Sequence, residues 1–133
     1  MGFRWGIALL VLVGFGFASL GCTPQPQVYR IHGTVSTTEG IPVPAGMIYF
    51  DPEGARTSPG VQGFAYIKDG KFDTADEGRG ASGGRYLARV QGFNGIANGE
   101  LPLGEPLSGE EEFKLDLPQG ESQQAFQLPP LEQ

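Results

Sequence analysis

Short runs of alternating apolar and polar residues recur along the chain from residue 28 to residue 128. Glycine, proline and other turn-forming residues separate these runs. An alternation with a period of two is typical of strands that bury one face, and no segment has a helical period over ten or more residues. The pattern predicts strands over 27–36, 47–50, 61–67, from Phe72 onwards, 85–91, 112–117 and 124–128. We therefore expect an all-β domain of about seven strands, packed as an antiparallel β-sandwich.

The clearest local signal is the turn Lys68-Asp69-Gly70-Lys71. An Asp-Gly pair between two strands favours a type I′ hairpin turn, because both central residues need a positive φ. In the strand 85–91 the alternation places Tyr86, Ala88 and Val90 toward the core. The first strand has the same pattern, and its outward face carries His32, the only histidine of the chain.

A long loop is expected over residues 92–110, which contain glycine, proline and little periodicity. Loops of this length are often functional. Phe93 and Asn94 at its start are therefore candidate ligand contacts, since an exposed aromatic ring can stack on a sugar. Tyr49 and Tyr66 are further candidates for such stacking, although their apolar neighbours are equally compatible with a place in the core.

The N-terminus has the three parts of a secretory signal. Arg4 precedes an uncharged apolar run over residues 5–17, and small residues then lead to Ser19-Leu20-Gly21-Cys22. A cysteine at this point resembles the lipobox of bacterial lipoproteins, in which it is acylated and becomes the first residue of the mature chain. We expect residues 1–21 to be the signal peptide, Cys22 the lipidated residue and residues 22–27 a flexible tether. The alternatives are an ordinary cleaved signal and a retained membrane anchor, for which the run is short.

Removal of the signal leaves 112 residues, enough for one domain. The net charge of the whole chain is −6, and the segment from Gly99 to Gln133 carries eight acidic residues against Lys114 alone. This acidic balance argues against nucleic acid as a partner and against electrostatic docking on anionic lipid headgroups. Contact with a membrane is therefore expected through acyl chains.

Four segments together resemble a known family. They are Gly33-Thr34-Val35, the run from Gly40 to Phe50, the run from Ile67 to Phe72 and the run from Gly83 to Val90. They resemble the transthyretin-like, or carboxypeptidase regulatory-like, β-sandwich found in short lipoproteins of planctomycete-type bacteria. The resemblance covers residues 28–91 well and the last two strands more loosely. It implies a transthyretin-like sandwich over residues 28–128, with residues 129–133 as a tail, but it implies no chemistry, because turn glycines and core residues make up the motifs.

Catalytic and metal-binding sites are not expected from the sequence. One histidine, His32, does not make a Ser/His/Asp set. The enzymatic branch of the transthyretin fold, hydroxyisourate hydrolase, uses several histidines and a C-terminal Tyr-Arg-Gly-Ser motif, which this chain does not have. The glycines of residues 78–83 match a nucleotide fingerprint, but a strand follows them, so a flexible loop is expected. The run Glu110-Glu111-Glu112 is interpreted as a solvated charge run rather than a calcium site.

The sequence thus predicts a lipid-anchored module of the cell envelope with a structural or binding role, without catalysis, cofactor or metal. The alternative is a glycan- or peptide-binding accessory domain at the cell surface. The expected partners are the membrane, through the acyl chains on Cys22, and an envelope protein or polysaccharide.

Overall fold

The computed structural model describes residues 27–54 and 60–130. The predicted signal peptide, the lipidation of Cys22, the tether up to residue 26 and the end of the tail at 131–133 lie outside the described residues. In the part of the chain that is described, no helix is long and apolar enough to cross a membrane.

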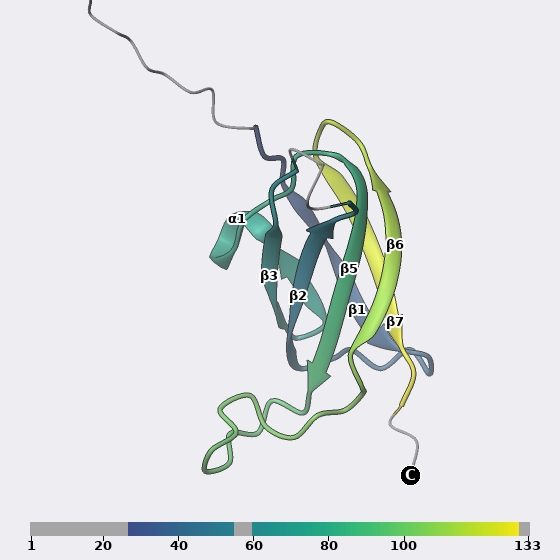
Figure 1. Cartoon of the computed structure of the whole chain (residues 1–133). Helices are drawn as coiled ribbons and strands as arrows, with labels where there is room; N and C mark the ends of the chain where they lie inside the picture. Colours follow the sequence, from purple (N-terminus) through teal and green to yellow (C-terminus); the bar gives the residue numbers. More distant parts are fainter. Residues whose placement is uncertain (1–26, 55–59, 131–133) are drawn as a thin grey trace, which may run out of the picture.

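The described residues form seven strands and one short helix, and the all-β prediction is confirmed (Figure 1). In chain order the elements are β1 (Ile31–Thr37), β2 (Ala45–Pro52), β3 (Gly63–Lys68), β4 (Lys71–Asp73), α1 (Thr74–Glu77), β5 (Gly84–Phe93), β6 (Glu111–Leu117) and β7 (Ser122–Leu128). All seven predicted strands are present, near their expected positions.

Hydrogen bonds join all seven strands in one sheet of order β6-β5-β2-β3-β4-β1-β7. The sheet curls until its two edge strands approach each other, and the ring centroids of Phe113 in β6 and Phe126 in β7 are 5.0 Å apart (Figure 1). The strands therefore form one curled, nearly closed sheet, where the sequence predicted two sheets packed face to face.

The prediction that all strands pair antiparallel is wrong for one pair, because β1 and β7 run parallel. The strands from β6 to β1 alternate in direction along the sheet, so β6 and β1 run opposite ways. The turn at residues 118–121 reverses the chain after β6. β7 therefore runs in the direction of β1, and at that edge only a parallel ladder can form.

The concave side of the sheet holds the core. It consists of Ile31, Val35, Val43, Ile48, Phe50, Ala65, Ile67, Phe72, Ala81, Tyr86, Ala88, Val90, Leu117, Phe126 and Leu128. The rings of Phe50, Phe72 and Phe126 contact one another in series, with centroids 6.2 and 5.8 Å apart. The inward positions predicted for the strand 85–91 are confirmed, since Tyr86, Ala88 and Val90 are all in this core.

The hairpin between β3 and β4 is confirmed as well. Asp69 has φ 51° and Gly70 has φ 76°, so both central residues of the turn have the positive φ that a type I′ turn requires. This hairpin places the outward side chains of β3 and β4 next to each other, with Lys68 opposite Lys71.

The single helical turn α1 was not predicted. Asp73 caps its N-terminus, because the Oδ1 atom accepts a hydrogen bond from the backbone N–H of Ala75 at 2.9 Å. After α1 the chain returns to the sheet, where Arg79 pairs with Phe64 and Ala81 pairs with Tyr29. The glycine-rich residues 78–83 are therefore partly fixed by sheet pairing and are not the flexible loop that was expected.

Tyr86 is 1% exposed, and its hydroxyl joins two segments. It donates to the carbonyl oxygen of Val61 at 2.9 Å and accepts from the backbone N–H of Ser82 at 3.1 Å. A Tyr86→Phe variant should lose about 1–2 kcal/mol of unfolding free energy, because both backbone groups lose this partner. Urea denaturation measures this loss. Tyr66→Phe is the control, since the exposed Tyr66 should lose almost nothing.

Candidate functional site

A hollow of about 420 Å³ lies between α1 and the outer face of β1, β3 and β4. Alternate residues of a strand point to the same face, and the register sets His32 opposite Asp73 and Thr34 opposite Lys71 on that outer face. The polar lining includes Arg30, His32, Lys71, Asp73 and Asp76, and Tyr66 adds an aromatic ring.

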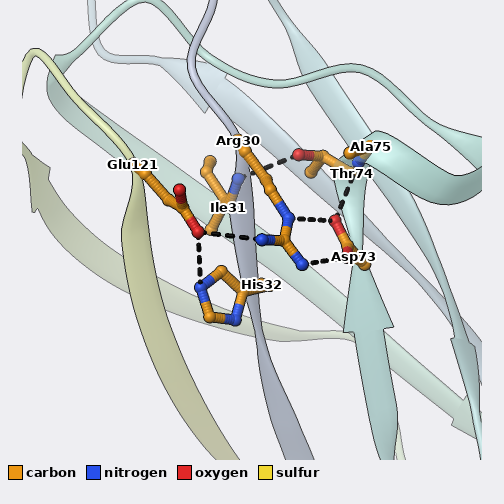
Figure 2. Close-up of polar contacts among 7 residues, drawn as sticks. All are labelled: Arg30, Ile31, His32, Asp73, Thr74, Ala75 and Glu121. Carbon is orange, nitrogen blue, oxygen red and sulfur yellow. Dashed lines mark hydrogen bonds and ion pairs between the residues drawn. The ribbon is translucent and has the colours of Figure 1, made fainter.

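A network of charged side chains forms one wall of the hollow (Figure 2). The guanidinium of Arg30 holds Asp73 with two contacts, Nε to Oδ1 at 2.9 Å and Nη2 to Oδ2 at 2.5 Å. Its Nη1 atom donates to Oε1 of Glu121 at 2.9 Å, and the same oxygen lies 3.1 Å from Nε2 of His32. Two contacts from one planar guanidinium fix the carboxylate in orientation as well as in distance. The network thus ties the start of β1 to the end of β4 and to the turn before β7.

The network also keeps the carboxylate of Asp73 ionised. The hydrogen bonds from Arg30, and after them the N–H of Ala75, lower the pKa of Asp73 to about 2. The hydrogen bond from Asp73 in turn raises the pKa of Arg30 above its usual value. Both groups therefore stay charged over the whole physiological pH range.

Helix α1 is connected to the same network. The Thr74 side chain is buried, and its Oγ1 atom accepts the backbone N–H of Ile31 at 2.9 Å. Asp73 thus serves two structural purposes, since it caps α1 and also pairs with Arg30. The wall of the hollow and the helix that covers it are held by the same residues.

Replacing Asp73 with Ala should lower the unfolding free energy by about 1–2 kcal/mol at pH 7, most of it from the lost cap. The contribution of ionised Asp73 is complete above the ordinary pKa of 3.8 and disappears as the pH falls through about 2. The difference between the wild type and the variant should therefore shrink between pH 4 and pH 2. Chemical denaturation over this pH range measures it.

The control for this prediction is Asp76→Ala in the same helical turn. Among the described residues no cation forms an ion pair with Asp76, so its loss should change stability by less than about 0.5 kcal/mol. If the difference in unfolding free energy between the wild type and Asp73→Ala stays constant from pH 7 to pH 2, the ionised carboxylate of Asp73 does not stabilise the fold as described.

The structure places Phe93 and Asn94 away from the hollow. Phe93 ends β5, half-buried, opposite Ala45. The side-chain oxygen of Asn94 accepts the backbone N–H groups of Ile96 at 2.9 Å and Glu105 at 3.2 Å, so it holds together the loop between β5 and β6. A ligand contact at Phe93 and Asn94 stays a prediction.

Of the other aromatic candidates, Tyr66 lies in the hollow and Tyr49 does not. Tyr66 is 38% exposed on the outer face of β3, with its ring edge-on to that of Phe64 at 6.2 Å. Tyr49 is half-buried, and the guanidinium of Arg89 lies over its ring, 5.1 Å from the centroid. Tyr66 is therefore the ring that a ligand can reach from the hollow.

The charged network is not predicted by the sequence, which places His32 only on the outward face of the first strand. Arg30 is 43 residues from Asp73 and 91 residues from Glu121, so only the fold brings these residues together. The sequence contains no local signal for such a cluster.

No group of three or more His, Cys, Asp or Glu residues could hold a metal ion within residues 27–54 and 60–130. In the run Glu110–Glu112, the first carboxylate lies 3.7 Å from Nη1 of Arg89. The other two belong to β6, where successive side chains point to opposite faces. The three carboxylates therefore do not converge.

Comparison of the chain with protein-family models, with curated proteins and with solved structures finds no match. The resemblance to transthyretin-like lipoproteins stays a prediction, and the site has to be interpreted from its own geometry.

Proposed function

We propose that this protein is an exported, lipid-anchored domain of the cell envelope that binds a partner rather than catalysing a reaction. The observation that carries the proposal is Cys22 at the exit of an uncharged apolar run that follows Arg4. This order of charged start, apolar core and small residues before a cysteine is the order of a lipoprotein signal.

The charged groups of the hollow support binding over catalysis. The Nε2 atom of His32 contacts Glu121, and within the described ranges no serine or threonine hydroxyl is hydrogen-bonded to His32. Nucleophilic catalysis of the Ser-His type requires such a pair. The carboxylate of Asp73 stays ionised and paired, so it is a poor proton donor or acceptor near neutral pH.

An anchor at Cys22 would also set the orientation of the domain. Gln27 follows Cys22 by five positions in the sequence, and five residue steps span at most about 18 Å. The end of the sheet where the chain enters β1 would then face the membrane. The loop between β5 and β6 lies at the opposite end and would point away from it (Figure 1).

The test of lipidation is metabolic labelling. Cells that produce the protein are grown with an alkyne-bearing fatty acid, and the purified protein is coupled to a fluorescent azide and examined on a denaturing gel. The proposal predicts a fluorescent band at the mass of the mature chain. A protein that is present in the membrane fraction but carries no label would refute it.

A second candidate function is that of a glycan- or peptide-binding accessory domain at the cell surface. The open hollow with the exposed Tyr66 favours it. Thermal denaturation in the presence of envelope polysaccharides and of peptides tests this function. An unchanged midpoint across the whole panel would count against both ligand classes.

A further inference from the structure

We propose that the hollow beside α1 binds a sugar, with Tyr66 as the stacking surface and Lys71 and Asp76 as hydrogen-bonding partners of its hydroxyls. This assignment rests on the proposed binding function and names its ligand class. The hollow favours a sugar by its aromatic surface, by the charge balance of its lining and by the paired side chains of its wall.

The aromatic surface is Tyr66. Its side chain points outward from β3 into the hollow, and its ring is edge-on to that of Phe64. The face of an aromatic ring carries partial negative charge, so it attracts the polarised C–H groups on one face of a sugar ring. The ring gives the ligand an exposed apolar surface beside charged side chains of the lining.

The charges of the lining balance. Its cations are Arg30, Lys68 and Lys71, and its carboxylates are Asp73, Asp76 and Glu77. A balanced lining does not attract a polyanion such as a nucleotide or a phosphorylated ligand. It does suit a neutral polyhydroxylated ligand, because each sugar hydroxyl both donates and accepts, and neighbouring cations and carboxylates offer both kinds of partner.

Two of these charges are available to a ligand. Among the described residues, neither Lys71 nor Asp76 has an ion-pair partner, and both are exposed. They come from the two sides of the hollow, since Lys71 lies on β4 and Asp76 on α1. A ligand between the two elements can therefore reach a donor and an acceptor at once.

The remaining charges of the lining are paired with one another. Arg30 is fixed by Asp73 and Glu121, and Nζ of Lys68 lies 3.2 Å from Oε2 of Glu77. Side chains that are ordered before binding lose little further entropy when the ligand arrives. The volume of about 420 Å³ is within the range of small-ligand sites and suits a mono- or disaccharide.

The test is isothermal titration calorimetry of the detergent-solubilised full chain. The probes are disaccharides built from glucose, galactose, N-acetylglucosamine or glucuronate, and a tripeptide is the comparison ligand. We expect at least one neutral disaccharide to bind with a dissociation constant of about 1 mM or below. Tyr66→Ala should weaken that binding at least about tenfold. Lys71→Gln and Asp76→Asn should each weaken it about threefold or more.

The matched controls are Tyr49→Ala and Phe93→Ala, aromatic residues outside the hollow that should leave affinity unchanged. Circular dichroism and the thermal midpoint verify that each variant is folded, which is expected for the exposed Tyr66. Binding that survives Tyr66→Ala but is lost in Phe93→Ala would overturn the site. Binding of the tripeptide alone, or of no probe, would overturn the ligand class. Acyl labelling is independent of these outcomes, so failure of the sugar site is distinguishable from failure of the lipid anchor.

Discussion

A Cys22→Ala variant is expected to move from the membrane fraction to the soluble envelope fraction. Each buried methylene of an acyl chain contributes about 0.8 kcal/mol to membrane binding, and two or more chains together anchor a protein stably. Electrostatic attraction to anionic lipid headgroups is not expected, because the chain has a net charge of −6. Loss of the thiol therefore removes the whole anchor. Fractionation of cells with quantitative immunoblotting measures the shift.

The matched control is Thr23→Ala, which changes the neighbouring residue and leaves the thiol in place. It should remain in the membrane fraction. If the Cys22→Ala variant also remains there, and its mass includes residues 1–21, the apolar run itself holds the protein in the membrane and the lipid anchor is wrong. If it remains there without those residues, the domain binds the membrane by a surface of its own.

Gly33→Ala should cause the largest loss of stability of the substitutions considered. Gly33 lies in β1 between β4 and β7, opposite Phe72 and Gln124. A Cβ atom at this position would lie 1.7 Å from the backbone oxygen of Gln124, and backbone cannot rotate away as a side chain can. The two strands must therefore separate locally. We expect a loss of about 3 kcal/mol or more of unfolding free energy, measured by guanidinium denaturation.

Gly120→Ala is the control for Gly33→Ala. It lies in the turn between β6 and β7, where a Cβ atom would meet nothing within 4 Å. Its stability should stay within about 0.5 kcal/mol of the wild type. If Gly33→Ala proves too unstable to purify while Gly120→Ala folds, the prediction is met. Equal stability of the two variants would mean that β7 does not pair with β1 as described.

Local features of the fold were predictable because their signals are local. The alternation in 85–91 identified the buried face of β5, and Asp69-Gly70 identified the hairpin between β3 and β4. In each case the residues that determine the structure are neighbours in sequence. The conformation needs no information from elsewhere in the chain.

Features that depend on distant residues were not predictable. The parallel pairing of β1 with β7 follows from the number and direction of all the strands between β6 and β1. Helix α1 has only four residues, too few for a periodic pattern. An aspartate before so short a segment is equally compatible with a turn, so the capping residue Asp73 does not identify the helix from the sequence.

The candidate site was not predictable from the sequence either, because its residues lie far apart in the chain. Tyr66 could be named from the sequence as a possible sugar contact, but its neighbours left both an exposed and a buried position open. The partnership of Arg30 with Asp73 and Glu121 depends on the register of β1 and on the turn before β7. Surface side chains that converge in this way leave no pattern in the sequence, because neither burial nor backbone geometry requires them.

The intact mass of the mature protein, purified from the membrane fraction of its own host, decides whether the domain is anchored by lipid. We expect a chain that begins at Cys22 and carries the added mass of two or more acyl chains. A chain that begins at or near Cys22 without lipid, or one that retains residues 1–21, would show that Cys22 carries no lipid anchor.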